Sequence, residues 1–223
     1  MRLYEYIDHT ILKPTTHITD IEKLCNEARE YSFAAVCVPP PFVNKTKQLL
    51  EGTQVKTATV IGFPFGYSAV EAKIAEILPA IEDGADELDI VINLIALKSN
   101  DWTFLAHEIN HIMPVIKQHK KIVKIIIETG VLTDDEIIKC CELYGTAGID
   151  YLKTSTGYAE KSATVEAVQL MRKYLASQVK IKASGGIRTY EFAMQLIEAG
   201  ADRLGCSASV AIMRQGINNA QGY

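Results

Sequence analysis

Short apolar runs rich in valine and isoleucine alternate along the chain with longer segments of helical period. Runs such as KIIIE and DIVIN contain no polar alternation, which is typical of strands buried on both faces of a parallel sheet. The pattern predicts eight strands, over residues 7–12, 34–38, 57–61, 87–92, 123–127, 150–153, 179–182 and 203–205.

The segments between these runs have the apolar spacing of helices. Residues 20–31 carry apolar side chains at i, i+3, i+4 and i+7, namely Ile21, Leu24, Cys25 and Ala28. Thr133 and Glu136 form a capping-box pattern at another helix start. Helices are predicted over residues 20–31, 70–81, 102–116, 133–144, 164–175 and 190–199, with a shorter helix after Pro41.

Strands and helices in alternation are typical of two α/β folds. The 223 residues divided among eight units leave about 28 for each, which fits a single-domain (β/α)8 TIM barrel. The alternative, an open doubly wound sheet, should place a G-x-G-x-x-G motif after its first strand, and none is present. We therefore expect one barrel over residues 1–223, with a short C-terminal tail from about residue 215. The similar segments GADELDI, GIDYLKT and GADRLGC predict a shared helix-to-strand turn.

Composition narrows the class of protein. Charged residues make up 22% and hydrophobic residues 48%, as in ordinary globular proteins. The net charge of −4 argues against nucleic-acid or anionic membrane partners. No secretory signal and no run of about 20 apolar residues is found. The five cysteines are odd in number and form no CxxC motif, so we expect free thiols and a cytoplasmic location.

Polar residues at predicted strand ends are the candidates for chemistry, because active sites of barrels lie there. Lys153 and Lys182 end consecutive strands, and neighbouring strands lie about 4.8 Å apart. Burial and mutual repulsion would lower a lysine pKa, and a neutral amine can attack a carbonyl to form a Schiff base. The alternative is an ion network in which the lysines only neutralise Asp89 or Glu128. The presence of two lysines on adjacent strands beside a carboxylate favours a catalytic role over a purely structural ion network.

Asp89 lies within an apolar run, where a carboxylate needs a partner. It could transfer protons, serve as a buried counter-ion, or do both. Asp86 and Glu87 precede this run and are expected to be solvated turn residues.

Two glycine-containing loops predict a phosphate site. Residues 183–188 read ASGGIR and follow the seventh strand, whereas residues 205–209 read GCSAS and precede a helix. In barrels these two loops and a helix N-terminus commonly bind phosphate through backbone N–H groups. Thr154 and Gly157, in the sequence TSTG after the sixth strand, could add donors.

Other candidates are weaker. His107 and His111 are four residues apart on a predicted helix, but no third ligand is suitably placed, so a solvated pair is favoured and no metal is expected. His9 could lie at the barrel mouth or in the core. Cys37 is expected to be a small buried thiol. Residues 62–66, which read GFPFG, are expected to form a rigid loop at the rim of the site.

Several motifs together resemble the deoxyribose-phosphate aldolase family of class I aldolases, nearly from end to end. They are IDHTILKP, AAVCVPP, VIGFPFG, ELDIVIN, KIIIETG, DYLKTSTG, KASGGIRT and RLGCSAS. The resemblance implies reversible cleavage of 2-deoxy-D-ribose 5-phosphate to acetaldehyde and D-glyceraldehyde 3-phosphate, without a cofactor.

The resemblance also implies a role for each matching residue. Lys153 would form the Schiff base, Lys182 would perturb it and share in proton transfer, and Asp89 would donate and accept protons. Asp8, Cys37 and Lys124 would line the site, and the phosphate would bind near Gly157, Gly185, Gly186 and Ser207. Some members end in a tyrosine that reaches the site, as Tyr223 could here. Ala208 departs from relatives that have a second serine, which removes one hydroxyl near the phosphate.

Two other functions stay open on the sequence. Another phosphosugar barrel, such as an epimerase, an isomerase or a different Schiff-base aldolase, would share the phosphate loops. A non-catalytic phosphate-ligand sensor would need neither lysine, so the presence of Lys153, Lys182 and Asp89 weighs against it. Barrels of this type often form homodimers, but the sequence identifies no interface.

Overall fold

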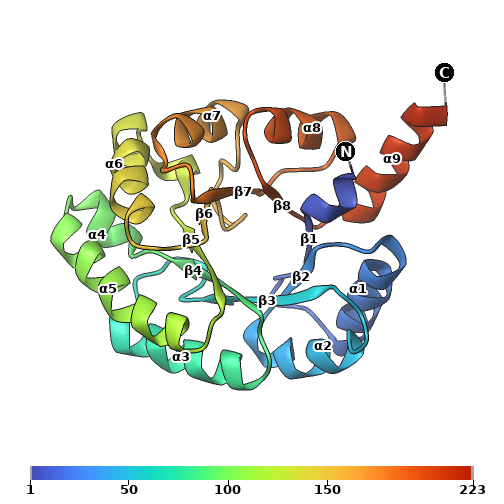
Figure 1. Cartoon of the computed structure of the whole chain (residues 1–223), viewed down its shortest axis with the longest axis horizontal. Coiled ribbons are helices and arrows are strands. Elements are labelled where there is room, and N and C mark those ends of the chain that lie inside the picture. The colour runs from blue at the N-terminus through green and yellow to red at the C-terminus, as the bar shows by residue number, and fades with distance from the viewer. Residues whose placement is uncertain (1, 222–223) are drawn as a thin grey trace.

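Eight parallel strands close into a barrel in sequential order, in a computed structural model that describes residues 2–221. Helices surround the barrel on its outer side (Figure 1). The predicted (β/α)8 TIM barrel is therefore confirmed. The strands are β1 (Ile7–Thr10), β2 (Ala35–Val38), β3 (Lys56–Ile61), β4 (Glu87–Val91), β5 (Ile122–Ile126), β6 (Tyr151–Lys153), β7 (Lys180–Ser184) and β8 (Arg203–Cys206).

The helices follow the predicted periodic segments closely. They are α1 (Ile18–Tyr31), α2 (Val43–Leu49), α3 (Val70–Glu82), α4 (Leu94–Lys98), α5 (Trp102–Gln118), α6 (Asp134–Gly145), α7 (Val165–Tyr174), α8 (Tyr190–Glu198) and α9 (Ser209–Gln221). Three 3-10 turns, η1 (Leu3–Tyr6), η2 (Pro40–Phe42) and η3 (Thr129–Val131), complete the described elements. The predicted capping box at Thr133 and Glu136 begins α6.

Two segments differ from the sequence-based expectation. Helix α4 was not predicted, because five residues are too few to show a helical period. The Asn93 side chain caps it by accepting a hydrogen bond from the Ala96 N–H at 3.0 Å. The segment expected as a tail from about residue 215 continues α9 as far as Gln221.

The three similar segments form the same turn and explain how successive strands are tied together. In each, the Asp side chain accepts a hydrogen bond from a backbone N–H near the start of the preceding strand. Asp86, Asp150 and Asp202 bind in this way at 3.0, 2.9 and 2.9 Å to Thr57, Val123 and Ile181. The repeated aspartate therefore fixes the entry of three strands into the barrel.

The apolar core and the charged interior are separate. Most buried apolar side chains form one cluster, whereas Cys37, Ala58 and Val60 form a small second one against which Leu12 and Phe63 pack. Charged side chains from several strands are also fully buried and contact one another, which places them inside the barrel. No helix within residues 2–221 is long and apolar enough to cross a membrane.

Candidate active site

Lys153 and Lys182 face each other directly in the barrel. They are register partners on β6 and β7. Both amines donate to the same oxygen of Asp89, Oδ2, at 2.7 Å from Lys153 and 2.8 Å from Lys182. All three side chains are buried. The sequence predicted that the lysines would meet; the structure adds that one carboxylate oxygen joins them.

Lys124 occupies the other side of Asp89. Its amine donates to Asp89 Oδ1 at 2.8 Å and forms an ion pair with Glu87 Oε2 at 2.5 Å. The expectation that Glu87 is a solvated turn residue is therefore wrong. Glu87 is the first residue of β4, and its side chain is 1% exposed because it points into the barrel toward Lys124.

Asp8 completes the network from β1. It accepts a short hydrogen bond from Lys182 through Oδ2, and Arg203 Nη1 donates to its Oδ1 at 2.6 Å. Sequence analysis named Asp8 as a residue of the site but did not name Arg203. Arg203 begins β8 directly after the GAD turn, and the sequence pattern there does not distinguish it from an ordinary strand-start residue.

The charges around the two lysines shift their pKa values in opposite directions. Burial lowers the pKa of Lys153, the Lys182 ammonium lowers it further, and Asp89 only partly offsets these effects. Burial also acts to lower the pKa of Lys182, but Asp8 and Asp89 outweigh it, so this pKa is raised. Burial would raise the pKa of Asp89, yet its three lysine neighbours hold that pKa well below the usual range. Lys153 is therefore the lysine suited to act as a neutral nucleophile.

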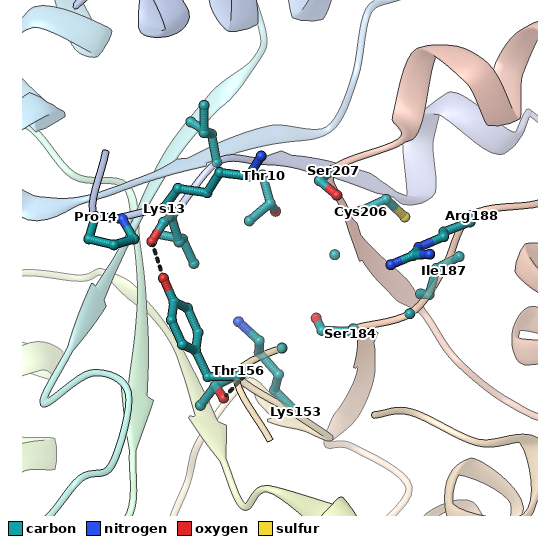
Figure 2. Close-up of a pocket in the computed structure, with 17 residues that line it drawn as sticks. Thr10, Lys13, Pro14, Lys153, Thr156, Ser184, Ile187, Arg188, Cys206 and Ser207 are labelled. Carbon is teal, nitrogen blue, oxygen red and sulfur yellow. Dashed lines mark hydrogen bonds between the residues drawn. The ribbon is translucent and has the colours of Figure 1, made fainter. Parts of the chain in front are cut away.

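A cavity of about 490 Å³ opens at the carboxyl ends of β1, β6, β7 and β8. Figure 2 shows the Lys153 amine pointing into it. Asp8, Asp89, Lys124 and Lys182 are fully buried and do not line the cavity. A small molecule bound in this cavity could therefore contact the Lys153 amine but not the side chains of Asp89 or Lys182.

The predicted phosphate residues lie together on one side of the cavity. Gly157, Gly185, Gly186 and Ser207 all line it. Gly185 has φ +86°, and a Cβ there would lie 2.8 Å from Ser162 Oγ, so the loop needs glycine at this position. Helix α9 begins at Ser209, two residues after Ser207. This side of the cavity presents the backbone and helix terminus that favour an anion.

Sequence analysis missed two cations at the same cavity. Arg188 and Lys13 line it, and Arg188 extends toward its centre (Figure 2). Neither forms an ion pair with any side chain that the structure describes. Arg188 could have been found, because it follows the glycine pair by two residues in the loop already assigned to phosphate.

Glu128 and Thr154 support the loop after β6. Glu128 has a left-handed backbone with φ 57° and accepts hydrogen bonds from the Thr156 N–H and hydroxyl, and burial raises its pKa. It therefore holds the TSTG segment rather than forming an ion pair with a lysine. Thr154 is buried outside the cavity lining, where its hydroxyl accepts from the Ser184 N–H at 3.0 Å.

The remaining candidates lie away from the reactive amine or stay inert. Cys37 is fully buried, and burial, with Asp89, raises the pKa of its thiol to about 11. His9 faces α1, where its Nε2 lies 2.7 Å from Glu27 Oε2. All five cysteines are free. In the residue 62–66 loop, the Phe63 ring packs edge-on at 5.4 Å against Tyr158, which lines the cavity.

The two histidines on α5 (Trp102–Gln118) lie against each other. His107 and His111 have ring centroids 3.9 Å apart. Among the described side chains, no group of three or more His, Cys, Asp or Glu residues could hold a metal ion. Tyr223 lies outside the described residues.

Comparison with known proteins identifies the family. Residues 3–217 match the family described as DeoC/LacD family aldolase. The chain belongs to this family. It is 49% identical over 223 residues to a deoxyribose-phosphate aldolase of Thermococcus gammatolerans, covering 99% of both chains. It is 47% identical to one of Caldanaerobacter subterraneus subsp. tengcongensis, covering 96% of this chain and 94% of the relative.

Solved structures agree with this DeoC/LacD assignment. The tetrameric deoxyribose phosphate aldolase of Aeropyrum pernix superposes with a TM-score of 0.89 at 31% identity, covering 97% of this chain and 92% of the other. The resemblance drawn from the motifs and the predicted enzyme class, an aldolase acting on a carbon–carbon bond, are thus confirmed.

Proposed function

We propose that this aldolase reversibly cleaves 2-deoxy-D-ribose 5-phosphate to acetaldehyde and D-glyceraldehyde 3-phosphate through a Schiff base on Lys153. The observation that carries the proposal is the Lys153 amine, which has a lowered pKa and faces a cavity that Gly185, Gly186 and Ser207 also line. The names of the 47–49% identical relatives support the choice of substrate.

The first step is imine formation. The neutral Lys153 amine attacks C1 of the open-chain sugar, and loss of water gives a protonated imine. Arg188 and the N–H groups near Gly185, Gly186 and Ser207 hold the phosphate at the other end of the substrate. This arrangement fixes the sugar between a covalent bond and an ionic one.

Carbon–carbon cleavage follows with the imine as electron sink. The C3 hydroxyl loses its proton, the C2–C3 bond breaks, and its electron pair becomes the enamine double bond between C1 and C2. Glyceraldehyde 3-phosphate departs with C3 as its aldehyde carbon. Asp89, which accepts a hydrogen bond from the Lys182 ammonium beside Lys153, takes up this proton through a water molecule and returns it to C2. Hydrolysis of the new imine releases acetaldehyde and regenerates Lys153. Since the iminium supplies the electron sink, the proposed steps need no metal or organic cofactor.

Reductive trapping tests the proposal. The protein is incubated with acetaldehyde, reduced with borohydride, digested and mapped by mass spectrometry. We expect a reduction-dependent ethyl group on Lys153, and loss of both adduct and activity in Lys153→Met. Lys56→Met, which removes an exposed lysine from the start of β3, is the matched control and should keep both. Labelling of scattered surface lysines only, with activity retained in Lys153→Met, would exclude the Schiff base and favour an epimerase-type reaction.

The predicted cytoplasmic location and homodimer stay predictions. Gel filtration with light scattering tests the second, and a mass other than twice that of the chain would contradict it.

A further inference from the structure

The ion pairs inside the barrel form one connected network that extends beyond the residues used in the proposed reaction. In the part of the chain that the structure describes, it joins three carboxylates to four cations: Asp8, Glu87 and Asp89 to Lys124, Lys153, Lys182 and Arg203. With every group ionised, the cations exceed the carboxylates by one. A buried excess charge is costly, so the network favours the loss of one proton.

The contacts decide which cation loses that proton. Arg203 stays charged, because a guanidinium does not deprotonate in proteins. Lys124 lies near three carboxylates, at 2.5 Å from Glu87, 2.8 Å from Asp89 and 3.8 Å from Asp8.

Lys182 contacts two carboxylates, Asp8 and Asp89. Lys153 has one ion-pair partner in this network, Asp89, and it shares that oxygen with Lys182. Lys153 is therefore the least compensated member of the network.

We propose that Arg203 and Glu87 are positioning residues that set the charge balance of this network and thereby the pH at which Lys153 becomes a neutral amine. Neither residue lines the cavity. The significance of that amine for catalysis rests on the proposed function, but its protonation can be measured without substrate.

Arg203 acts through Asp8. Its Nη1 engages Asp8 Oδ1 at 2.6 Å, and its Nη2 is anchored by the Tyr151 hydroxyl at 3.3 Å. Without the guanidinium, Asp8 would attract Lys182 more strongly and leave the shared Asp89 oxygen to Lys153. Removing the Arg203 charge therefore stabilises protonated Lys153.

Glu87 acts through Lys124 in the opposite sense. It lies 2.5 Å from the Lys124 amine, which also binds Asp89 Oδ1. Without the Glu87 charge, Lys124 would neutralise Asp89 more fully, and Asp89 would then stabilise protonated Lys153 less. Removing the Glu87 charge therefore favours the neutral amine.

The other titratable groups near Lys153 are the same in every variant. They are Asp8 from β1, Cys37 from β2, Asp89 from β4, Lys124 from β5, Glu128 from the loop after β5, Lys182 from β7 and Cys206 from β8. Burial raises the pKa of Cys37 to about 11 and of Cys206 to about 12, so both thiols stay neutral near pH 7. Glu128 is held by Thr156.

Competitive labelling of lysines with acetic anhydride over a pH series, read by mass spectrometry, gives the titration midpoint of Lys153 without any substrate. We expect the midpoint to rise in Arg203→Gln and to fall in Glu87→Gln. Each shift should be about one pH unit, the effect of a unit charge about 10 Å away at an effective dielectric constant of about 20. The double variant restores the balance and should titrate near wild type, and Arg203→Lys should shift less than Arg203→Gln.

Opposite shifts distinguish charge balance from structural damage. Midpoints that move in the same direction, or do not move, would overturn the inference. Glu51→Gln, an exposed matched control, should leave the midpoint unchanged. If Arg203→Gln does not fold, the Lys153 titration midpoints of Glu87→Gln and Arg203→Lys still test the inference. The midpoint should fall in Glu87→Gln. Trapping with acetaldehyde in the wild type tests the proposed function separately, because labelling could shift as expected even if no imine formed.

Discussion

Removing the charge of Lys182 should raise the pKa of Lys153. The two amine nitrogens lie 2.7 and 2.8 Å from one oxygen of Asp89, which places them roughly 5 Å apart. Two unit charges about 5 Å apart repel each other by about 3 kcal/mol at an effective dielectric constant of about 20, which corresponds to about two pH units. Lys182→Met also leaves the shared oxygen to Lys153 alone, which acts in the same direction.

The direction of the change in rate follows because only the neutral amine of Lys153 forms the Schiff base. A higher pKa means that less Lys153 is neutral at pH 7, so Schiff-base formation should slow by up to about 100-fold. The assay is the initial rate of borohydride-trapped adduct on Lys153, measured with acetaldehyde from pH 6 to pH 10. We expect the rate of Lys182→Met to approach that of wild type as the pH rises through the new pKa.

Two results would refute this reasoning. One is a rate profile of Lys182→Met whose midpoint coincides with that of wild type. The other is a uniform loss of rate at every pH, which would assign Lys182 a role other than lowering the pKa of Lys153. Lys56→Met, with an exposed lysine removed, should reproduce the wild-type profile.

Three further predictions concern the support of the site. Lys73→Met should destabilise the protein by about 3–5 kcal/mol in urea unfolding, because Glu108 is left buried without its partner at 2.6 Å; the double variant with Glu108→Leu should recover most of the loss. Gly205→Ala places a Cβ against Ser184 Oγ and 3.1 Å from Lys182 Cε, so it should displace both side chains and lower kcat while circular dichroism stays native. Arg188→Gln should raise KM for the phosphosugar about 10- to 100-fold, but not for unphosphorylated deoxyribose.

Each of these predictions can fail cleanly. A single Lys73→Met variant as stable as wild type would show that the buried pair contributes nothing. An unchanged kcat in Gly205→Ala would show that Ser184 and Lys182 both accommodate the added carbon. Equal effects of Arg188→Gln on both sugars would place that side chain away from the phosphate.

The local pattern of the sequence determined the elements of the fold. Unbroken runs such as KIIIE predicted buried parallel strands because both faces of a barrel strand are covered, one by helices and one by the interior. The repeated Gly-x-Asp segments predicted a common turn because they share one short sequence. In the structure, the aspartate of each segment accepts a hydrogen bond from a backbone N–H of the neighbouring strand. The pair of Lys153 and Lys182 was found because adjacent strands in sequence are adjacent in the barrel.

Only the tertiary structure decided the composition and charge of the interior. Because Glu87 precedes an apolar run, the sequence predicted a turn residue. In the closed barrel its side chain is buried and forms an ion pair with Lys124. Arg203 and Asp8 are 195 residues apart and meet because β8 closes on β1. The pKa of Lys182 is raised rather than lowered because two carboxylates from distant strands reach it. The sequence determines which side chains each strand carries, whereas the register and closure of the barrel decide which of them share one buried volume and so neutralise one another.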